Sequence, residues 1–67
     1  MLSREEHDIR MRLTVKGYRL LDLHVLTLDH RTIYRLILAD PDAPDGKRMV
    51  QDAYPRILQK IGRLPAR

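Results

Sequence analysis

The stretch TIYRLILAD, residues 32–40, decides how this chain folds. Its β-branched and aliphatic residues are typical of a buried strand, but a run this short can also belong to a helix. Because side chains alternate between the two faces of a strand, a strand here places Tyr34, Leu36 and Leu38 on one face. The neighbouring segments have to decide between the two structures.

Residues 32–37, TIYRLI, resemble the recognition-helix core of AlpA-type phage regulators and excisionases, which are small winged helix-turn-helix proteins. The resemblance implies a helix in which Thr32, Tyr34 and Arg35 face DNA. The chain departs from that family in several places. Asp29-His30 stands where the family has a turn glycine, and the basic wing with its tryptophan is absent. We therefore favour a strand over 33–39 and keep the helix-turn-helix as the alternative.

Two preceding segments alternate in the same way. In IRMRLTVK, residues 9–16, every second residue is apolar. LLDLHVLTL, residues 20–28, has one largely apolar face of Leu21, Leu23, Val25 and Thr27 and one mixed face. A period of two predicts half-buried strands. A three-residue loop at 16–18 and a four-residue loop at 29–32 place the apolar residues of all three strands on one common face. The expected cross-strand pairs are Leu28 with Ile33, Val25 with Leu36 and Leu23 with Leu38.

Ser3 and Glu6 have the spacing of a capping box, which marks the start of a helix. The alternation that follows limits any opening helix to a single turn. Further along, residues 40–46 contain two prolines, three aspartates and a glycine, which together predict a loop.

The C-terminal stretch predicts a helix over about 53–62, because its apolar residues recur at i, i+3 and i+4. Asp52 is the expected N-cap, and Pro55 then falls in the first turn, where proline is tolerated. Residues 47–51 are either a helical lead-in or a short extra strand. The tail, 63–67, is expected to be flexible.

We therefore expect an α+β fold: a three-stranded antiparallel β-meander with one C-terminal helix packed on one face. The strands are expected at about 8–16, 19–28 and 33–39. Sixty-seven residues make a single small domain, 1–67, close to the lower limit for a chain that buries its own core. Burying a further face would stabilise it, so a homodimer is expected.

The chain has a net charge of +4 and contains no cysteine. The positive charge is largely arginine, whose planar group suits phosphate and carboxylate, so an anionic partner is expected. No apolar run approaches the roughly 20 residues of a membrane span, and the charged residues 1–10 do not form a signal peptide. We expect a cytoplasmic protein that does not bind membranes.

No motif predicts a reaction or a cofactor. The three histidines lack the spacing of metal ligands, and no cysteine assists them, so no metal site is expected. Ser3 is the only serine, and no nucleophile–base pair or glycine-rich phosphate loop is present. We expect a binding protein with no small-molecule substrate, rather than an enzyme.

Two functions stay open. The first is a basic nucleic-acid-binding or regulatory protein, and the second is a protein-interaction module, such as a phage-type inhibitor or adaptor that docks on a larger host complex. In both, the predicted interface lies on the sheet face away from the helix, with a second basic set on and around the helix. The candidate binding residues are Arg10, Arg12, His24, Arg35, Arg48, Arg56 and Lys60, and the apolar interface candidates are Leu26, Leu28, Ile33 and Ile37.

Overall fold

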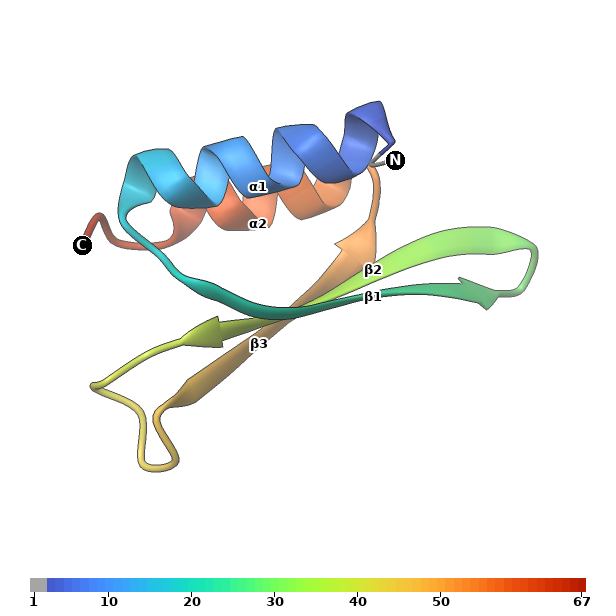
Figure 1. Cartoon of the computed structure of the whole chain (residues 1–67). Helices are drawn as coiled ribbons and strands as arrows, with labels where there is room; N and C mark the ends of the chain where they lie inside the picture. The colour runs from blue at the N-terminus through green and yellow to red at the C-terminus, as the bar shows by residue number, and fades with distance from the viewer. Residues whose placement is uncertain (1–2) are drawn as a thin grey trace.

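The computed structural model describes residues 3–67, so the first two residues of the expected domain 1–67 lie outside the described part. Three strands form one antiparallel sheet in the order β1-β2-β3. Two helices lie beside each other on one face of this sheet and leave the other face uncovered (Figure 1). The α+β class with a three-stranded antiparallel meander is confirmed. The elements are α1 (Arg4–Lys16), β1 (Leu20–Leu28), β2 (Arg31–Ala39), β3 (Lys47–Ala53) and α2 (Arg56–Arg63).

The strand expected at about 8–16 is wrong, because these residues belong to the 13-residue helix α1. The helix begins where the capping-box spacing indicated, with the Glu6 amide donating to Ser3 Oγ at 3.1 Å. It ends at Gly17, whose φ of 86° is the left-handed conformation typical of helix C-termini. The amide of Tyr18 then donates to the carbonyl of Leu13 at 2.9 Å, closing the last turn. The predicted single opening turn is therefore a complete helix.

Only two of the four alternating apolar residues in this segment are buried. Ile9 and Leu13 are four residues apart, so a helix places them on the same face, and both lie in the core. Met11 and Val15 fall on the outer side of α1, where they are exposed. The helix therefore buries half of the set that a strand would have buried.

The hairpin between β1 and β2 is tighter than predicted. Asp29 and His30, both with positive φ, form a two-residue turn in place of the four-residue loop 29–32. As a result Leu28 pairs with Arg31, and the register from Asp22 to Leu28 differs by two residues from the predicted one. Over these residues a shift of two keeps every side chain on its predicted face. An irregularity between Leu20 and Asp22 reverses the faces at the start of β1, so that Leu20 packs against the core and Leu21 is exposed.

Beyond the loop, residues 47–53 form β3, which pairs antiparallel with β2. The second of the two readings for residues 47–51 is therefore confirmed. The final helix starts at Arg56, three residues later than expected, because Asp52 belongs to β3 and Pro55 is the N-cap. The alternative helix-turn-helix reading of TIYRLI is wrong, because β2 runs through it as the central strand.

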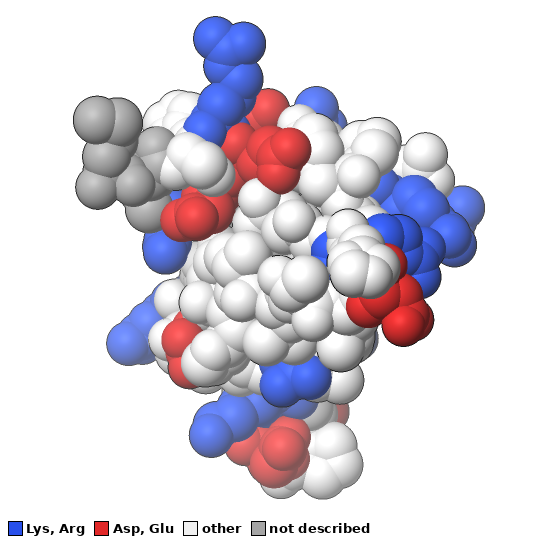
Figure 2. Space-filling model, turned by 90° about the vertical axis from the view of Figure 1, so that its right-hand side faces the viewer, with Lys and Arg blue, Asp and Glu red and all other residues white. Residues whose placement is uncertain are grey.

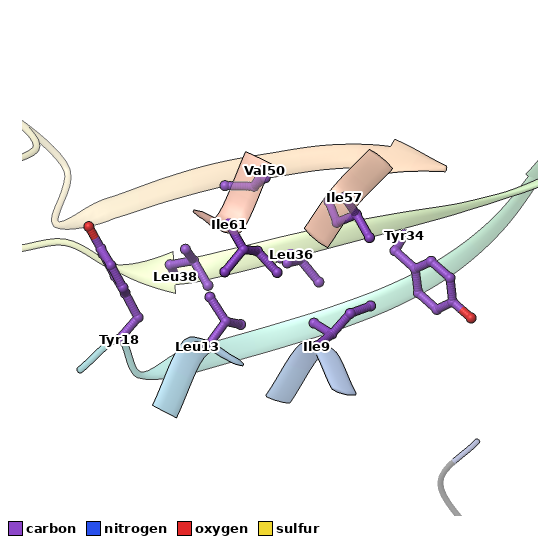
Figure 3. Close-up of a cluster of buried hydrophobic side chains, with 9 residues drawn as sticks. All are labelled: Ile9, Leu13, Tyr18, Tyr34, Leu36, Leu38, Val50, Ile57 and Ile61. Carbon is purple, nitrogen blue, oxygen red and sulfur yellow. The ribbon is translucent and has the colours of Figure 1, made fainter. Parts of the chain in front are cut away.

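The core lies between the helices and the sheet (Figure 3). Two isoleucines of α2 pack with the two buried residues of α1 over the inner face of β2, and two tyrosines lie at opposite ends of the cluster. Both helices thus depend on the same strip of β2 for their burial. The cluster contains Ile9, Leu13, Tyr18, Tyr34, Leu36, Leu38, Val50, Ile57 and Ile61.

The C-terminal tail, which was expected to be flexible over 63–67, makes several contacts with the rest of the molecule. The Tyr18 hydroxyl donates to the carbonyl of Pro65 at 2.7 Å, and the Arg67 amide donates to the carbonyl of Lys16 at 2.8 Å. The Arg67 guanidinium also forms an ion pair with Asp40, a buried carboxylate at the end of β2. These contacts hold the tail against the C-terminal end of α1.

Candidate functional site

The predicted binding residues occupy three separate places in the structure. Those of β1 and β2 lie together on the sheet face opposite the helices, which we call the open sheet face. The two arginines of the first segment lie on α1, on the other side of the sheet. The remaining three basic residues lie on β3 and α2.

The open sheet face brings six predicted residues together. Pairing of β1 with β2 sets His24 beside Arg35 and Leu26 beside Ile33, with the other two on the same side of the sheet. This shared placement is what the alternation predicted, although a role in binding stays a prediction. The six are His24, Leu26, Leu28, Ile33, Arg35 and Ile37.

Strand β3 adds to this face two residues that the sequence did not select. Met49 pairs with Ile37 and is 60% exposed, and Gln51 pairs with Arg35. Arg35 Nε donates to Gln51 Oε1 at 2.8 Å, which joins the side chains of β2 and β3 on this face. The sequence does not indicate Met49 and Gln51 as members of this face, because the pattern of residues 47–51 fits a strand and a helix equally.

One end of the open sheet face is apolar and the other carries polar groups. Leu28, at the hairpin end, is 50% exposed, whereas Ile33 beside it is only 7% exposed. Towards the other end, Asp22 and His24 form a surface pair at 2.9 Å. An exposed pair of this kind contributes little to stability. It therefore gives no structural reason for the exposed apolar side chains on the same face.

Arg10 and Arg12 do not lie on the open sheet face, because their segment is α1 and not a strand. Both side chains are exposed on the helix. Within residues 3–67, no carboxylate lies within 4.0 Å of either guanidinium. They are therefore available to an external anion, but from the opposite side of the molecule to the one predicted.

The other three basic candidates already have carboxylate partners. Arg48 Nε lies 3.1 Å from the buried Asp40. Arg56 and Lys60 both approach Asp52, at 3.7 and 3.3 Å. The pKa of Asp52 is lowered, chiefly by the backbone amide of Ala53 and also by these two cations. Arg56 and Lys60 remain substantially exposed, so they can still contact an anion alongside Asp52.

A shallow groove runs between α1 and α2 on the outer side of the helices. Its apolar part comes from Met11 and Val15, which are 50% and 82% exposed, and from the buried Ile61. Gly62 keeps it open, since nothing lies within 4 Å of the position a Cβ would take there. Arg12 and Lys16 supply the polar rim of the groove. Lys16 Nζ donates to the carbonyls of Gly62 and Leu64, which ties the two helix ends together.

The charges along the chain are unevenly divided between the two layers. Residues 9–21 contain four basic residues and no carboxylate, and residues 53–67 also contain four basic residues and no carboxylate. The two helices run side by side in the same direction, so the C-terminal half of α1 lies next to α2 (Figure 1). We call the solvent-exposed sides of the two helices together the helical surface. Among its basic members are Arg10, Arg12, Arg56, Lys60 and Arg63. Arg12 borders the groove between the helices, whereas Arg56 and Lys60 lie on the side of α2 next to Asp52.

The opposite end of the molecule has a different charge pattern. Viewed from the side towards which the hairpin points, basic and acidic groups alternate around a neutral centre (Figure 2). The carboxylates Glu5, Glu6 and Asp8 lie in the N-terminal half of α1, at this end. The helical segments that contain basic residues and no carboxylate are therefore the C-terminal half of α1 and the whole of α2. Arg63 also belongs to the helical surface. The sequence does not indicate it, because its position beside α1 follows only from the parallel arrangement of the two helices.

Two tyrosines join α1 to the rest of the fold through carboxylates. The hydroxyl of Tyr34 donates to Glu5 at 2.6 Å, and that of Tyr54 donates to Asp8 at 3.2 Å. Burial, together with the Glu5 carboxylate, raises the pKa of Tyr34 to about 12. Burial and Asp8 raise the pKa of Tyr54 in the same way. Glu5 and Asp8, two of the three acidic residues of α1, therefore have structural roles.

Within residues 3–67, no group of three metal-ligating side chains comes together. Over the same residues, no helix is long and apolar enough to cross a membrane. The only serine, Ser3, uses its hydroxyl to cap α1. Comparison of the chain with protein-family models, with curated proteins and with solved structures gives no match. A functional assignment must therefore be argued from the helical surface and the open sheet face themselves.

Proposed function

We propose that this chain is a non-enzymatic nucleic-acid-binding protein that contacts phosphates through its helical surface. The observation that carries the proposal is the uneven charge distribution. Two chain segments with eight basic residues and no carboxylate are folded into neighbouring helices and their flanks. Three of the arginines on this surface, Arg10, Arg12 and Arg63, have no carboxylate partner within residues 3–67.

The chemistry of the helical surface suits a phosphate backbone better than it suits bases. Arginine binds phosphate oxygens through two parallel hydrogen bonds, and it carries its charge at every physiological pH. No aromatic residue lies on α1 or α2, so base stacking of the kind used by single-strand binders is not supported. Contacts made to phosphates alone position a protein without reading sequence. The proposal is therefore one of largely sequence-independent binding to a duplex.

The test is the salt dependence of binding to a fluorescently labelled DNA duplex, measured by anisotropy. Each phosphate neutralised contributes about −0.9 to the slope of log affinity against log salt. Contacts from the five basic residues of the helical surface would give a slope of roughly −4 to −5. Affinity should then fall by about 10²- to 10³-fold between 50 and 200 mM salt.

Two triple variants with equal charge change locate the contact. In the first, Arg10, Arg12 and Arg63 are changed to Gln, and the salt slope should become shallower by about 2 to 3. In the matched control, Arg31→Gln, Arg35→Gln and Lys47→Gln remove three charges from the sheet side, and the slope should change by less than about 1. An equal change of the salt slope in the two variants would mean that binding depends only on the net charge of the protein, and this would contradict the proposal. Wild-type binding that is insensitive to salt would also contradict it.

A second candidate function is supported by the open sheet face. Its exposed Leu28 and Met49, with Leu26 and Ile37 beside them, form an apolar area in which Arg35 has no carboxylate partner within residues 3–67. The complementary partner is a protein that presents apolar side chains and a carboxylate for Arg35. Leu26→Asp combined with Ile37→Asp should abolish capture of that partner from nuclease-treated host extract, and the helical triple variant should not. The reverse result would contradict this second function.

A further inference from the structure

The outer edge of β1 has a hydrogen-bonding pattern that follows from the tight turn. In a two-residue hairpin, the residues that flank the turn form a hydrogen-bonded pair, here Leu28 with Arg31. Along an antiparallel strand, hydrogen-bonded positions alternate with positions whose amide and carbonyl point away. His24 and Leu26 therefore bond to β2, whereas Val25 and Thr27 direct their backbone groups outwards.

The outward groups of β1 are only partly occupied. At the start of the strand, Asp22 Oδ1 accepts the Leu23 amide at 2.9 Å, which caps that position and confirms that it points outwards. The amides and carbonyls of Val25 and Thr27 have no hydrogen-bond partner within residues 3–67. An exposed edge strand with unpaired amides and carbonyls is a template on which another strand can form backbone hydrogen bonds.

The outer edge of β3 is treated differently. There, side chains of the same chain occupy three of the outward backbone groups, which hinders addition of a further strand. These contacts are the Lys47 amide to Asp45 at 3.1 Å, the Ala53 amide to Asp52 at 2.7 Å, and Lys60 to the Gln51 carbonyl at 2.8 Å. The Met49 amide and carbonyl stay free within residues 3–67, but groups on both sides of them are occupied, so β1 is the more open of the two edges.

The side chains beside the open edge are also suited to an added strand. Residues 25–28 are Val, Leu, Thr and Leu, with no charge, proline or glycine to oppose pairing. Val25 on the helix side and Leu28 on the open sheet face are each 50% exposed. The hairpin extends past the N-terminal end of α1, so the helices do not cover this part of the strand (Figure 1).

We infer that two copies of this chain associate by antiparallel pairing of their β1 edges, with the two-fold axis at Leu26. In this register Val25 of each copy forms a hydrogen-bonded pair with Thr27 of the second copy, giving four backbone hydrogen bonds. Leu26 then lies opposite Leu26 of the second copy. The two three-stranded sheets become one six-stranded sheet, a form of β-strand addition.

The charges around the edge are complementary in this register. His24 lies opposite Leu28 of the second copy, so neither strand places like charges against each other. Continued past the strand ends, the register sets Asp22 against His30 of the second copy, a carboxylate against an imidazole. A shift of the axis to Val25 would instead require the Leu23 amide, which Asp22 already occupies.

This dimer has a geometric consequence for the helices. A two-fold axis perpendicular to the sheet keeps corresponding faces on the same side. Both helical surfaces would then point in one direction, and a single duplex could contact both. The inference does not rest on the nucleic-acid proposal, since oligomeric state and duplex affinity are measured separately.

The test is cysteine cross-linking of the full chain, which has no cysteine of its own. Opposed residues of a non-hydrogen-bonded pair have Cα atoms about 4.5 Å apart, within the range of a disulfide. Leu26→Cys should therefore form a disulfide dimer under mild oxidation. Because pairing holds the thiols at an effective concentration of about millimolar, cross-linking should be at least about tenfold faster than for Met49→Cys, the exposed control on the β3 edge. Leu26→Cys at the rate of this control would overturn the inference.

A mixed pair guards against a Leu26 variant that fails to fold. His24→Cys and Leu28→Cys, both at exposed positions, should cross-link when mixed and much less when oxidised alone. Sedimentation equilibrium supplies a second readout. Thr27→Pro removes an outward amide and should abolish the dimer, whereas Met49→Pro on the β3 edge should leave it intact. A chain that stays monomeric at every concentration, or a dimer unaffected by Thr27→Pro, would overturn the inference.

Discussion

The burial of Ile9 gives a stability test of the α1 helix. Ile9 is 0% exposed and contacts the core between the helices and the sheet, whereas Met11, two residues later, is 50% exposed. A strand would place both side chains on the same buried face. The helix separates them by about 200° around its axis, so the two substitutions Ile9→Ala and Met11→Ala should have very different costs.

The magnitude follows from the burial. Truncating a fully buried isoleucine to alanine costs about 2–5 kcal/mol, because the lost burial adds to the cost of the cavity. Ile9 is completely enclosed, so we expect about 3–4 kcal/mol. Alanine has the higher helix propensity, so Met11→Ala at its exposed site should change the free energy of unfolding by less than about 1 kcal/mol.

Urea unfolding followed by circular dichroism measures both variants. A domain of this size has a free energy of unfolding of roughly 3–10 kcal/mol, so Ile9→Ala could unfold part of the population at the outset. In that case the milder variant Ile9→Val is measured instead of Ile9→Ala. It should cost about 0.5–1.5 kcal/mol and lower Tm by roughly 4–10 °C. Equal losses for the Ile9 and Met11 variants would refute the orientation of α1.

Two further predictions concern a backbone position and a buried hydroxyl. Gly17→Ala should destabilise the fold by about 1 kcal/mol or more beyond Gly46→Ala in the same unfolding assay. Both glycines have a positive φ, so both substitutions strain the backbone. Only at Gly17 would the new Cβ also meet a backbone atom, the Arg67 carbonyl oxygen at 2.7 Å. Equal costs would mean that the tail does not pack against Gly17. Burial and Glu5 raise the pKa of Tyr34 to about 12 from its ordinary value of 10, so the stability that its neutral form contributes should be complete below pH 10 and lost as the pH rises towards 12. Unfolding measured between pH 9 and 11.5 should show this loss and Tyr34→Phe should reduce it; an equal loss in both proteins would rule Tyr34 out as its source.

The sheet could be predicted in outline because its strongest signals are short-range. The alternation in residues 20–28 and 33–39 correctly divided Leu36 and Leu38 from Arg35 and Ile37. The register could not be predicted, because the turn is formed by Asp29-His30 without a glycine. Asp tolerates positive φ, but asparagine-glycine and aspartate-glycine are the usual signals for such a turn.

The first helix was missed because one pattern fits two structures. Alternating apolar residues at 9, 11, 13 and 15 contain two pairs four residues apart, 9 with 13 and 11 with 15, and this is also the spacing of a helix face. The signals that decide between them lie at the ends. Ser3 caps the start, and Gly17 ends the helix with a left-handed φ. Weighing these two caps together would have indicated a helix of the observed length.

The candidate site changed with that helix. Arg10 and Arg12 lie on the helical surface and not on the sheet, so these two arginines do not share a face with Leu26 and Ile37 as predicted, whereas Arg35 does. Arg63 joins them only because the two helices run in parallel, which is a tertiary feature without a local signal. The ion pairs of Arg56 and Lys60 with Asp52 likewise depend on where β3 ends.

Chemical-shift mapping tests most directly which face of the protein binds nucleic acid. A ¹⁵N-labelled sample is titrated with an unlabelled DNA duplex, and the backbone amide shifts are assigned to residues. We predict that the largest shifts fall in residues 10–16 and 56–63, on the helical surface, and that the amides of β2 change little. Largest shifts on the open sheet face, or none at low salt, would contradict the proposed function.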